Sequence, residues 1–156
     1  MTTPTTPTTP TTPATAAAPP AGLTEAVLDR AAGHRLLDEL QDRPTREATL
    51  PGLERIAPGF PDWIVTSLFG GTYQRPGLDL RDRQLLNLAT LGTLGGVDPQ
   101  LTGHIRSSLR VGLTREQIVE VFVHLAPYIG TPKALAALRV VAATFQALDE
   151  QDEAAR

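Results

Sequence analysis

Residues 75–132 decide the fold, and they read RPGLDLRDRQLLNLATLGTLGGVDPQLTGHIRSSLRVGLTREQIVEVFVHLAPYIGTP. Glycine and proline divide this stretch into three segments whose apolar residues recur with the helical period. We therefore predict helices at residues 80–94, 99–111 and 115–129. The first of them is apolar on most of its circumference, which indicates a central helix that other helices or another subunit bury.

Start and stop signals support these boundaries. Aspartate and threonine are favoured at the position before a helix, proline in the first turn, and glycine after the last turn. The signals are Asp79, the pairs Asp98-Pro99 and Thr131-Pro132, the capping box Thr114-x-x-Gln117, and Gly112 as a left-handed cap. The Thr131-Pro132 pair predicts a further, alanine-rich helix after the three central ones, with Leu135, Leu138, Val141 and Phe145 on its apolar side.

The chain before residue 75 is less regular. A segment at 24–42, beginning with Thr24 as N-cap, predicts one helix or two, because Gly33 interrupts it. Residues 44–59 hold three prolines and two glycines, which predicts a connector with at most a short helix. Residues 61–73 predict another helix, weakened at Gly70-Gly71, with Trp63, Ile64, Ser67 and Leu68 on one face. No segment alternates like a strand, so we predict an all-α fold of about six to seven helices.

The composition divides the chain into three parts. Residues 1–22 are almost purely threonine, proline and alanine, which is typical of a disordered tail and not of a signal peptide. Residues 23–149 form the predicted helical domain, and residues 150–156 a frayed acidic C-terminus.

Several function classes are excluded by composition. The chain has no cysteine, which excludes disulfides, thiolate metal sites and cysteine nucleophiles. A formal net charge of -3 favours neither nucleic acid nor an anionic membrane surface as a partner. No apolar run is long enough to span a membrane, so we expect a cytoplasmic protein.

Histidines and arginines are the candidate site residues. His104 lies on the apolar side of its predicted helix, where it is either a core histidine or a general acid or base. His124 and Tyr128 lie one turn apart beside an apolar face, with the same two interpretations. Arg75, Arg81 and Arg83 flank the start of the central helix, where they either clamp a substrate carboxylate or pair with nearby acidic residues. His34 lies among charged residues and is interpreted as solvated. Two histidines on separate helices, without matched carboxylates, are a weak case for a metal, so we expect no metal.

Three motifs within this framework resemble the carboxymuconolactone decarboxylase family. They are R-P-G-L-x-x-R-x-R from Arg75, a run from His104 with G, T, I and E-V at fixed spacing, and H-x-x-x-Y-x-G-x-P ending at Pro132. The likeness covers roughly residues 55–147. It implies an all-α fold of the alkylhydroperoxidase D type that assembles into a ring, as a homo-hexamer or homotrimer. Val97 and Gln100 stand where the peroxidase-linked branch has its two cysteines, so the resemblance points to the decarboxylase branch.

The resemblance implies a cofactor-free decarboxylation of 4-carboxymuconolactone to an enol-lactone. The lactone carbonyl, conjugated to the departing carboxyl through an alkene, accepts the electron pair. On this interpretation His104 donates the proton or stabilises the dienolate, and Arg75, Arg81 or Arg83 hold substrate oxygens. His124 and Tyr128 are then secondary pocket residues. Two alternatives stay open: a related enzyme acting on another lactone or keto-acid metabolite, and a non-catalytic oligomeric binder of small molecules.

Overall fold

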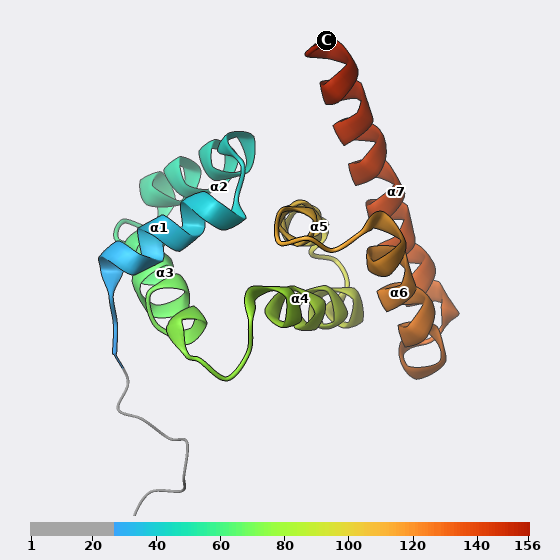
Figure 1. Cartoon of the computed structure of the whole chain (residues 1–156), viewed down its shortest axis with the longest axis horizontal. Coiled ribbons are helices and arrows are strands. Elements are labelled where there is room, and N and C mark those ends of the chain that lie inside the picture. Colours follow the sequence, from blue (N-terminus) through green and yellow to red (C-terminus); the bar gives the residue numbers. More distant parts are fainter. Residues whose placement is uncertain (1–26) are drawn as a thin grey trace, which may run out of the picture.

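The computed structural model describes residues 27–156, apart from the side chains of residues 48 and 49. Within that range the chain forms seven α-helices and no strand, which confirms the all-α prediction (Figure 1). The elements are α1 (Arg30–Leu40), α2 (Arg43–Ile56), α3 (Phe60–Ile64), the π-turn η1 (Val65–Phe69), the 3₁₀ turn η2 (Thr72–Gln74), α4 (Leu80–Leu94), α5 (Asp98–Arg110), α6 (Arg115–Ile129) and α7 (Thr131–Ala154). Thr24 and the predicted 1–22 tail lie outside the described residues.

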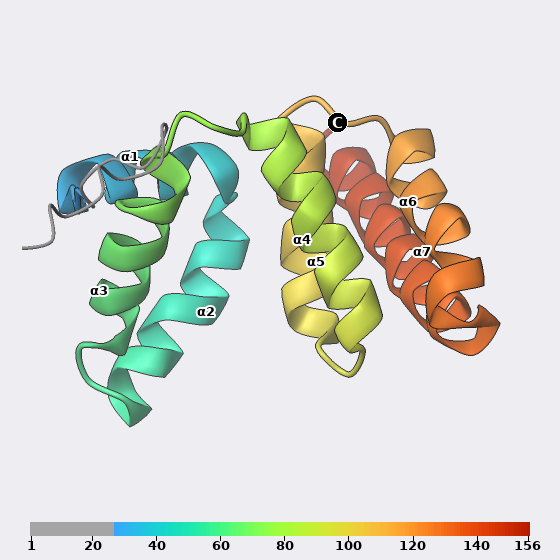
Figure 2. The same cartoon turned by 90° about the horizontal axis from the view of Figure 1, so that it is seen from below.

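Two hydrophobic clusters organise the helices. The first lies between α1 and η1 and is built from Leu36, Leu37, Leu40, Val65 and Phe69. The second and larger one joins α4 to α7 around the fully buried Leu88, Ile105, Ile118 and Phe122. Figures 1 and 2 show α4 and α5 in the middle, with α1–α3 on one side and α6 and α7 on the other.

The start and stop signals of the central helices are largely confirmed. The Asp79 side chain accepts a hydrogen bond from the Asp82 backbone N–H at 2.8 Å, and the Thr114–Gln117 capping box is present in both directions. Gly112 has the predicted left-handed backbone, with a φ of 87°. Two caps are one residue earlier than predicted: Val97 precedes α5, and Gly130 precedes α7.

The prediction of a connector at residues 44–59 is wrong. These residues hold most of α2, a helix of 14 residues. The Asp42 side chain caps it by accepting from the Thr45 N–H at 2.9 Å, and Pro44 occupies the first turn, where it needs no hydrogen bond. Pro51 lies inside the helix without ending it.

The predicted apolar face of residues 61–73 is also wrong. The buried residues are Pro61, Val65 and Phe69, whereas Trp63 is 62% exposed. The segment continues into the π-turn, in which the Gly70 N–H donates to the carbonyl of Val65, five residues back, at 2.8 Å. Val65 and Phe69 are buried because this side packs against the leucines of α1, and a helical period alone does not say which side meets another helix.

The central helix α4 is only partly covered by its own chain. Its buried residues are Gln84, Leu88 and Gly92, and Gly92 lets the Phe122 ring approach where a side chain would collide. Leu86 and Leu94, in contrast, are 54% and 63% exposed. Helices of the same chain therefore do not bury the whole circumference of α4.

The last helix differs from the sequence prediction in two details. Its buried residues are Ala134, Ala137, Val141 and Thr144, whereas Leu135 is 46% exposed. The small alanines bring α7 close to its neighbours and leave the larger leucine outside. The helix continues to Ala154 and so includes most of the 150–156 segment.

Two arginines of α5 connect the two halves of the fold. Arg106 forms an ion pair with Asp42 at 2.5 Å, and Arg110 donates to the Glu39 carbonyl at 2.7 Å. Burial on its own raises the pKa of Asp42. The hydrogen bonds from Thr45 and Arg106 outweigh burial, and the pKa ends below its ordinary value.

Candidate active site

His104 lies on α5 and faces α4. Its ring nitrogen Nδ1 is 2.8 Å from Oε1 of Gln84 and 3.4 Å from Nδ2 of Asn87. Gln84 is fully buried, whereas His104 and Asn87 are partly exposed. Ser108, one turn along α5, donates to the His104 carbonyl at 2.7 Å. The imidazole is therefore held from the α4 side and open on another.

Tyr73 extends this arrangement. Its hydroxyl accepts a hydrogen bond from Nδ2 of Asn87 at 2.7 Å, and the guanidinium of Arg83 lies over its ring at 5.4 Å. We call Tyr73, Gln84, Asn87 and His104 the His104 cluster. Its four members come from η2, α4 and α5, and none of them carries a fixed charge.

Burial controls the ionisation of the cluster. It lowers the pKa of His104 below the ordinary value of 6.5, because desolvation disfavours the imidazolium. Burial also raises the pKa of Tyr73 above 10.0, an effect that the hydrogen bond from Asn87 and the charge of Arg83 only partly offset. At neutral pH, with no ligand bound, both groups are neutral.

The amide of Gln84 determines which imidazole nitrogen carries the proton. When Oε1 faces His104, Nδ1 must be the donor, so Nε2 of a neutral ring has a free lone pair. In this orientation Nε2 of Gln84 is buried and has no hydrogen-bond partner among the described residues. A half-turn of the amide would instead donate to Nδ1 and place the imidazole proton on Nε2. The orientation of the Gln84 amide thus determines both the tautomer of His104 and which amide atom has a hydrogen-bond partner.

Arg83 and Arg75 lie beside the cluster. Arg83 donates to the backbone carbonyls of Leu78 at 3.1 Å and Arg75 at 2.7 Å. The Arg75 side chain is exposed and forms no ion pair with the described residues. Neither arginine pairs with Asp79 or Asp82, so the charge of Arg83 next to Tyr73 is not neutralised by a described carboxylate.

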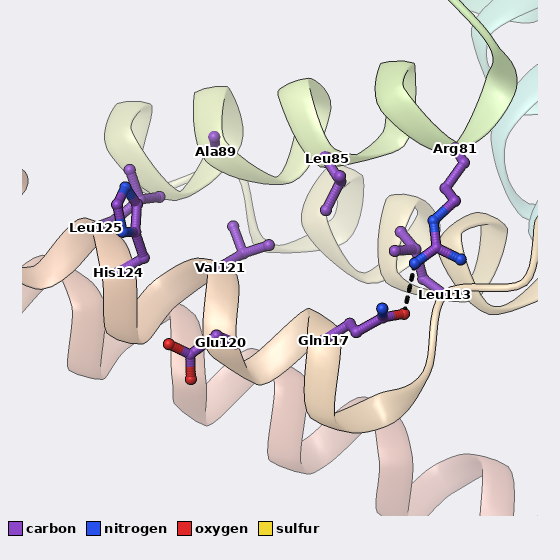
Figure 3. Close-up of a pocket in the computed structure, with 9 residues that line it drawn as sticks. All are labelled: Arg81, Leu85, Ala89, Leu113, Gln117, Glu120, Val121, His124 and Leu125. Carbon is purple, nitrogen blue, oxygen red and sulfur yellow. Dashed lines mark hydrogen bonds between the residues drawn. The ribbon is translucent and has the colours of Figure 1, made fainter.

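Arg81 and His124 lie elsewhere, in a groove between α4 and α6 (Figure 3). The groove has a volume of about 380 Å³, and neither His104 nor any other member of the His104 cluster lines it. Tyr128 is 73% exposed, and its ring lies 5.3 Å from that of His124. The structure therefore divides the sequence-predicted site residues between two places.

Three members of the His104 cluster were missed by sequence reasoning. Gln84 and Asn87 carried a usable signal, because they are polar residues three apart on an otherwise apolar helix. Residues at that spacing share a face, and a polar pair on a buried face needs a partner. Tyr73 gave no comparable signal, since its position depends on the turn after the π-turn.

Across residues 27–156, no three histidine, aspartate or glutamate side chains gather closely enough to hold a metal ion. No helix in the same range combines the length and hydropathy needed to cross a bilayer.

Comparison with known proteins identifies a family whose model matches the chain. The family model described as "CMD: Carboxymuconolactone decarboxylase family" matches residues 58–143, which include α3 to α6, most of α7, the His104 cluster and the groove.

Three curated relatives are also similar to the chain. A 4-carboxymuconolactone decarboxylase of Acinetobacter baylyi is 30% identical over 100 residues, which are 64% of this chain and 74% of the relative. The nitrosuccinic acid decarboxylase npaB of Metarhizium robertsii is 35% identical over 107 residues, 67% of each chain. An uncharacterized 15.0 kDa protein of Paracoccus denitrificans is 29% identical over 100 residues, 64% of this chain and 75% of the relative.

Proposed function

Because the chain belongs to the carboxymuconolactone decarboxylase family and is a carboxy-lyase, we propose that it decarboxylates an activated small carboxylic acid at the His104 cluster. The observation that carries this proposal is the partly exposed imidazole of His104, whose Nδ1 is held by Oε1 of Gln84. The leading substrate is 4-carboxymuconolactone, and no cofactor is required by the chemistry.

The two named decarboxylases among the relatives act on compounds with a common feature. In 4-carboxymuconolactone the departing carboxyl is on a saturated carbon next to an alkene that is conjugated to the lactone carbonyl, and nitrosuccinic acid has a carboxyl on the carbon that bears the nitro group. In both compounds a neighbouring group accepts the electron pair when the carbon–carbon bond to CO₂ breaks. We therefore define the substrate class as a carboxylate adjacent to, or conjugated with, an electron-withdrawing group.

The proposed reaction has two steps. First, the bond to the carboxyl breaks, CO₂ leaves, and the electron pair moves into the carbonyl or nitro group to give a dienolate or nitronate. Second, Nε2–H of the His104 imidazolium gives its proton to carbon, and water returns a proton to the imidazole afterwards. Nδ1–H stays hydrogen-bonded to Oε1 of Gln84 throughout both steps, so the imidazole ring keeps its orientation.

The negative charge of the substrate favours the imidazolium form of His104, which is the acid in the second step. The pKa of His104 is lowered in the free protein by burial, but an anionic substrate beside the ring favours the imidazolium and raises the pKa. The guanidinium of Arg83 lies over the Tyr73 ring of the cluster, and we assign Arg83, with Arg75, to the substrate oxygens. Partial burial of the site weakens the hydration of the departing carboxylate, which favours its loss as neutral CO₂.

The test is release of CO₂ from defined substrates. We expect the purified full chain to convert 4-carboxymuconolactone, followed by loss of its ultraviolet absorbance, or another member of the class such as nitrosuccinic acid. Turnover of only the second compound would favour the alternative of a related enzyme with a different substrate. Absence of CO₂ from lactone, nitro and keto acids alike would leave the alternative of a non-catalytic binder and refute the proposal.

We also propose that the protein is a homo-oligomer, a hexamer or a trimer. The support is the apolar surface that the single chain leaves uncovered on α4, α6 and α7, namely Leu86, Leu94, Val123 and Leu135. Burying such residues is favourable by about 25 cal/mol per Å² of apolar surface. We expect light scattering to give three or six times the chain mass at micromolar concentration. A monomeric mass there would contradict the proposal.

A further inference from the structure

We infer that the groove between α4 and α6 is a separate binding site for a small monocarboxylate with an apolar body. The inference does not depend on the proposed decarboxylation, because it concerns binding at residues that are not part of the His104 cluster. Figure 3 shows the arrangement, with Arg81 at one end of an apolar channel and His124 at the other.

Arg81 carries a charge that no described carboxylate neutralises. Its Nη1 donates to the Gly112 carbonyl at 3.0 Å, and its Nη2 donates to Oε1 of Gln117 at 2.8 Å. Both acceptors are neutral, and among the described residues Arg81 forms no ion pair. An arginine has five N–H donors, so several remain for an anion. The guanidinium is thus oriented by the protein and left without a counter-charge.

The two hydrogen-bond acceptors of Arg81 fix the orientation of its guanidinium. Oε1 of Gln117 also accepts from the Thr114 backbone N–H at 3.0 Å, as part of the capping box of α6. Gly112, the other acceptor, lies in the left-handed turn between α5 and α6. Both partners of Arg81 therefore belong to well-determined helix boundaries. A cation held in this way loses little freedom when it binds a carboxylate, which favours affinity.

Beyond Arg81 the groove has apolar walls and the size of a small-molecule site. Leu85 and Ala89 on α4 face Val121 and Leu125 on α6, and these side chains line the channel beyond Arg81. A volume of about 380 Å³ falls within the range of about 300–1,000 Å³ that is usual for small-molecule sites. The occupant predicted from these walls is an aliphatic or aromatic acid whose carboxylate meets Arg81.

The far end limits the occupant to one carboxylate. Glu120 and His124 line the groove one and two turns along α6 from Gln117. A second carboxylate placed there would meet the negative charge of Glu120, which disfavours dicarboxylates. An uncharged, apolar far end of the ligand avoids this repulsion and can lie against the His124 ring.

The groove and the His104 cluster lie on different faces of α4. Arg81, Leu85 and Ala89 are spaced by four and form one stripe, which faces α6. Asn87 is two residues from Leu85, which places it on the opposite side of the helix, toward α5. No residue of α5 itself lines the groove. A ligand in the groove consequently does not touch His104.

The charge of Arg81 also distinguishes this occupant from a second copy of the chain. A purely apolar helix laid into the groove would cover the guanidinium without pairing it, and a buried unpaired charge is costly. An apolar acid supplies both the matching surface and the matching charge. We therefore commit to the small carboxylate and treat coverage by a second copy as an outcome of the test.

The test is calorimetric titration of the full chain with 4-phenylbutanoate, compared with its neutral amide. We expect saturable binding of the acid, and at least tenfold weaker binding of the amide. Arg81→Gln should weaken binding of the acid by at least about tenfold, the scale of one charge-assisted hydrogen bond. Arg139→Gln, an exposed arginine of α7 outside the groove, is the matched control and should leave binding unchanged.

His104→Gln separates this site from the proposed catalytic one, since we expect it to leave 4-phenylbutanoate binding intact even if it abolishes turnover. Loss of binding in that variant would place the ligand at the His104 cluster and overturn the inference. Equal binding of acid and amide, or no binding of the acid to wild type, would also overturn it. So would an Arg81→Gln variant that binds normally but changes mass in light scattering, because the groove would then be a contact between copies.

Discussion

Replacing His104 by glutamine should lower kcat by about 100-fold or more, the usual contribution of a general acid. Glutamine can still hydrogen-bond to Gln84, so the packing between α4 and α5 is kept while the transferable proton is lost. The measurement is CO₂ release under saturating substrate, with circular dichroism and thermal unfolding to confirm the fold. A variant that retained near wild-type kcat would show that His104 is a core histidine.

His34→Gln provides the matched control for this experiment. His34 is exposed on α1 and has no contact with the His104 cluster. Replacing His34 removes an imidazole from α1 and leaves His104 on α5 in place, so the rate of CO₂ release should stay unchanged. If both variants lost activity equally, the loss would reflect general destabilisation and not the chemistry of His104.

The second large effect is expected from Gln84→Glu, which places a carboxylate where Oε1 now lies, 2.8 Å from Nδ1 of His104. An opposite charge at that distance raises the pKa of the imidazole by about 1–3 units. In the wild type, kcat/KM should fall as pH rises through the lowered pKa of free His104, because the imidazolium is the proton donor. The variant should keep this activity to a pH at least about one unit higher.

Gln84→Leu is the apolar control for the Gln84→Glu experiment. Leucine keeps the site buried but removes the acceptor that orients His104, so kcat should fall without any rise in the pH midpoint. Kinetic pH profiles of both variants distinguish charge from packing. An unchanged midpoint in Gln84→Glu would mean that the ionisation controlling kcat/KM does not belong to His104.

Burial of His104 also determines how the free energy of unfolding changes with pH. The pKa of His104 is lower in the folded chain than in the unfolded one, so the unfolded chain binds more protons between the two values. The contribution of neutral, buried His104 to the free energy of unfolding is therefore fully present above about pH 6.5, the pKa in the unfolded chain. This contribution is lost as pH falls through the pKa in the folded chain. The Gln84→Glu variant should lose less stability on acidification over this window.

The sequence predicted the C-terminal four helices well because local chemistry determines their ends. Asp79, the Thr114–Gln117 capping box and Gly112 act within a few residues of the chain, and all three are found as expected. Residues 44–73 were predicted poorly for the opposite reason. There Asp42 starts a helix that contains a proline, and packing against α1 decides which side of residues 61–69 is buried. Neither effect follows from a regular period.

The site was predictable in part. His104 stood out as a histidine on an apolar face, and the structure pairs it with Gln84 and Asn87. Grouping it with Arg81 and His124 was reasonable from motif spacing, but spacing along the chain does not say which helix packs against each face of α4. That assignment depends on how α5 and α6 pack against α4, which is tertiary information.

The two faces of α4 have a consequence for how this protein can diversify. His104 and Arg81 share no hydrogen-bond partner, since one contacts Gln84 and Asn87 and the other contacts Gly112 and Gln117. Substitutions without shared partners have nearly additive effects when the residues are well separated. Selection can therefore alter the walls of the groove, at Val121 or Leu125, while the proton donor on the other face stays as it is. One helix thus allows ligand preference and reaction chemistry to evolve independently.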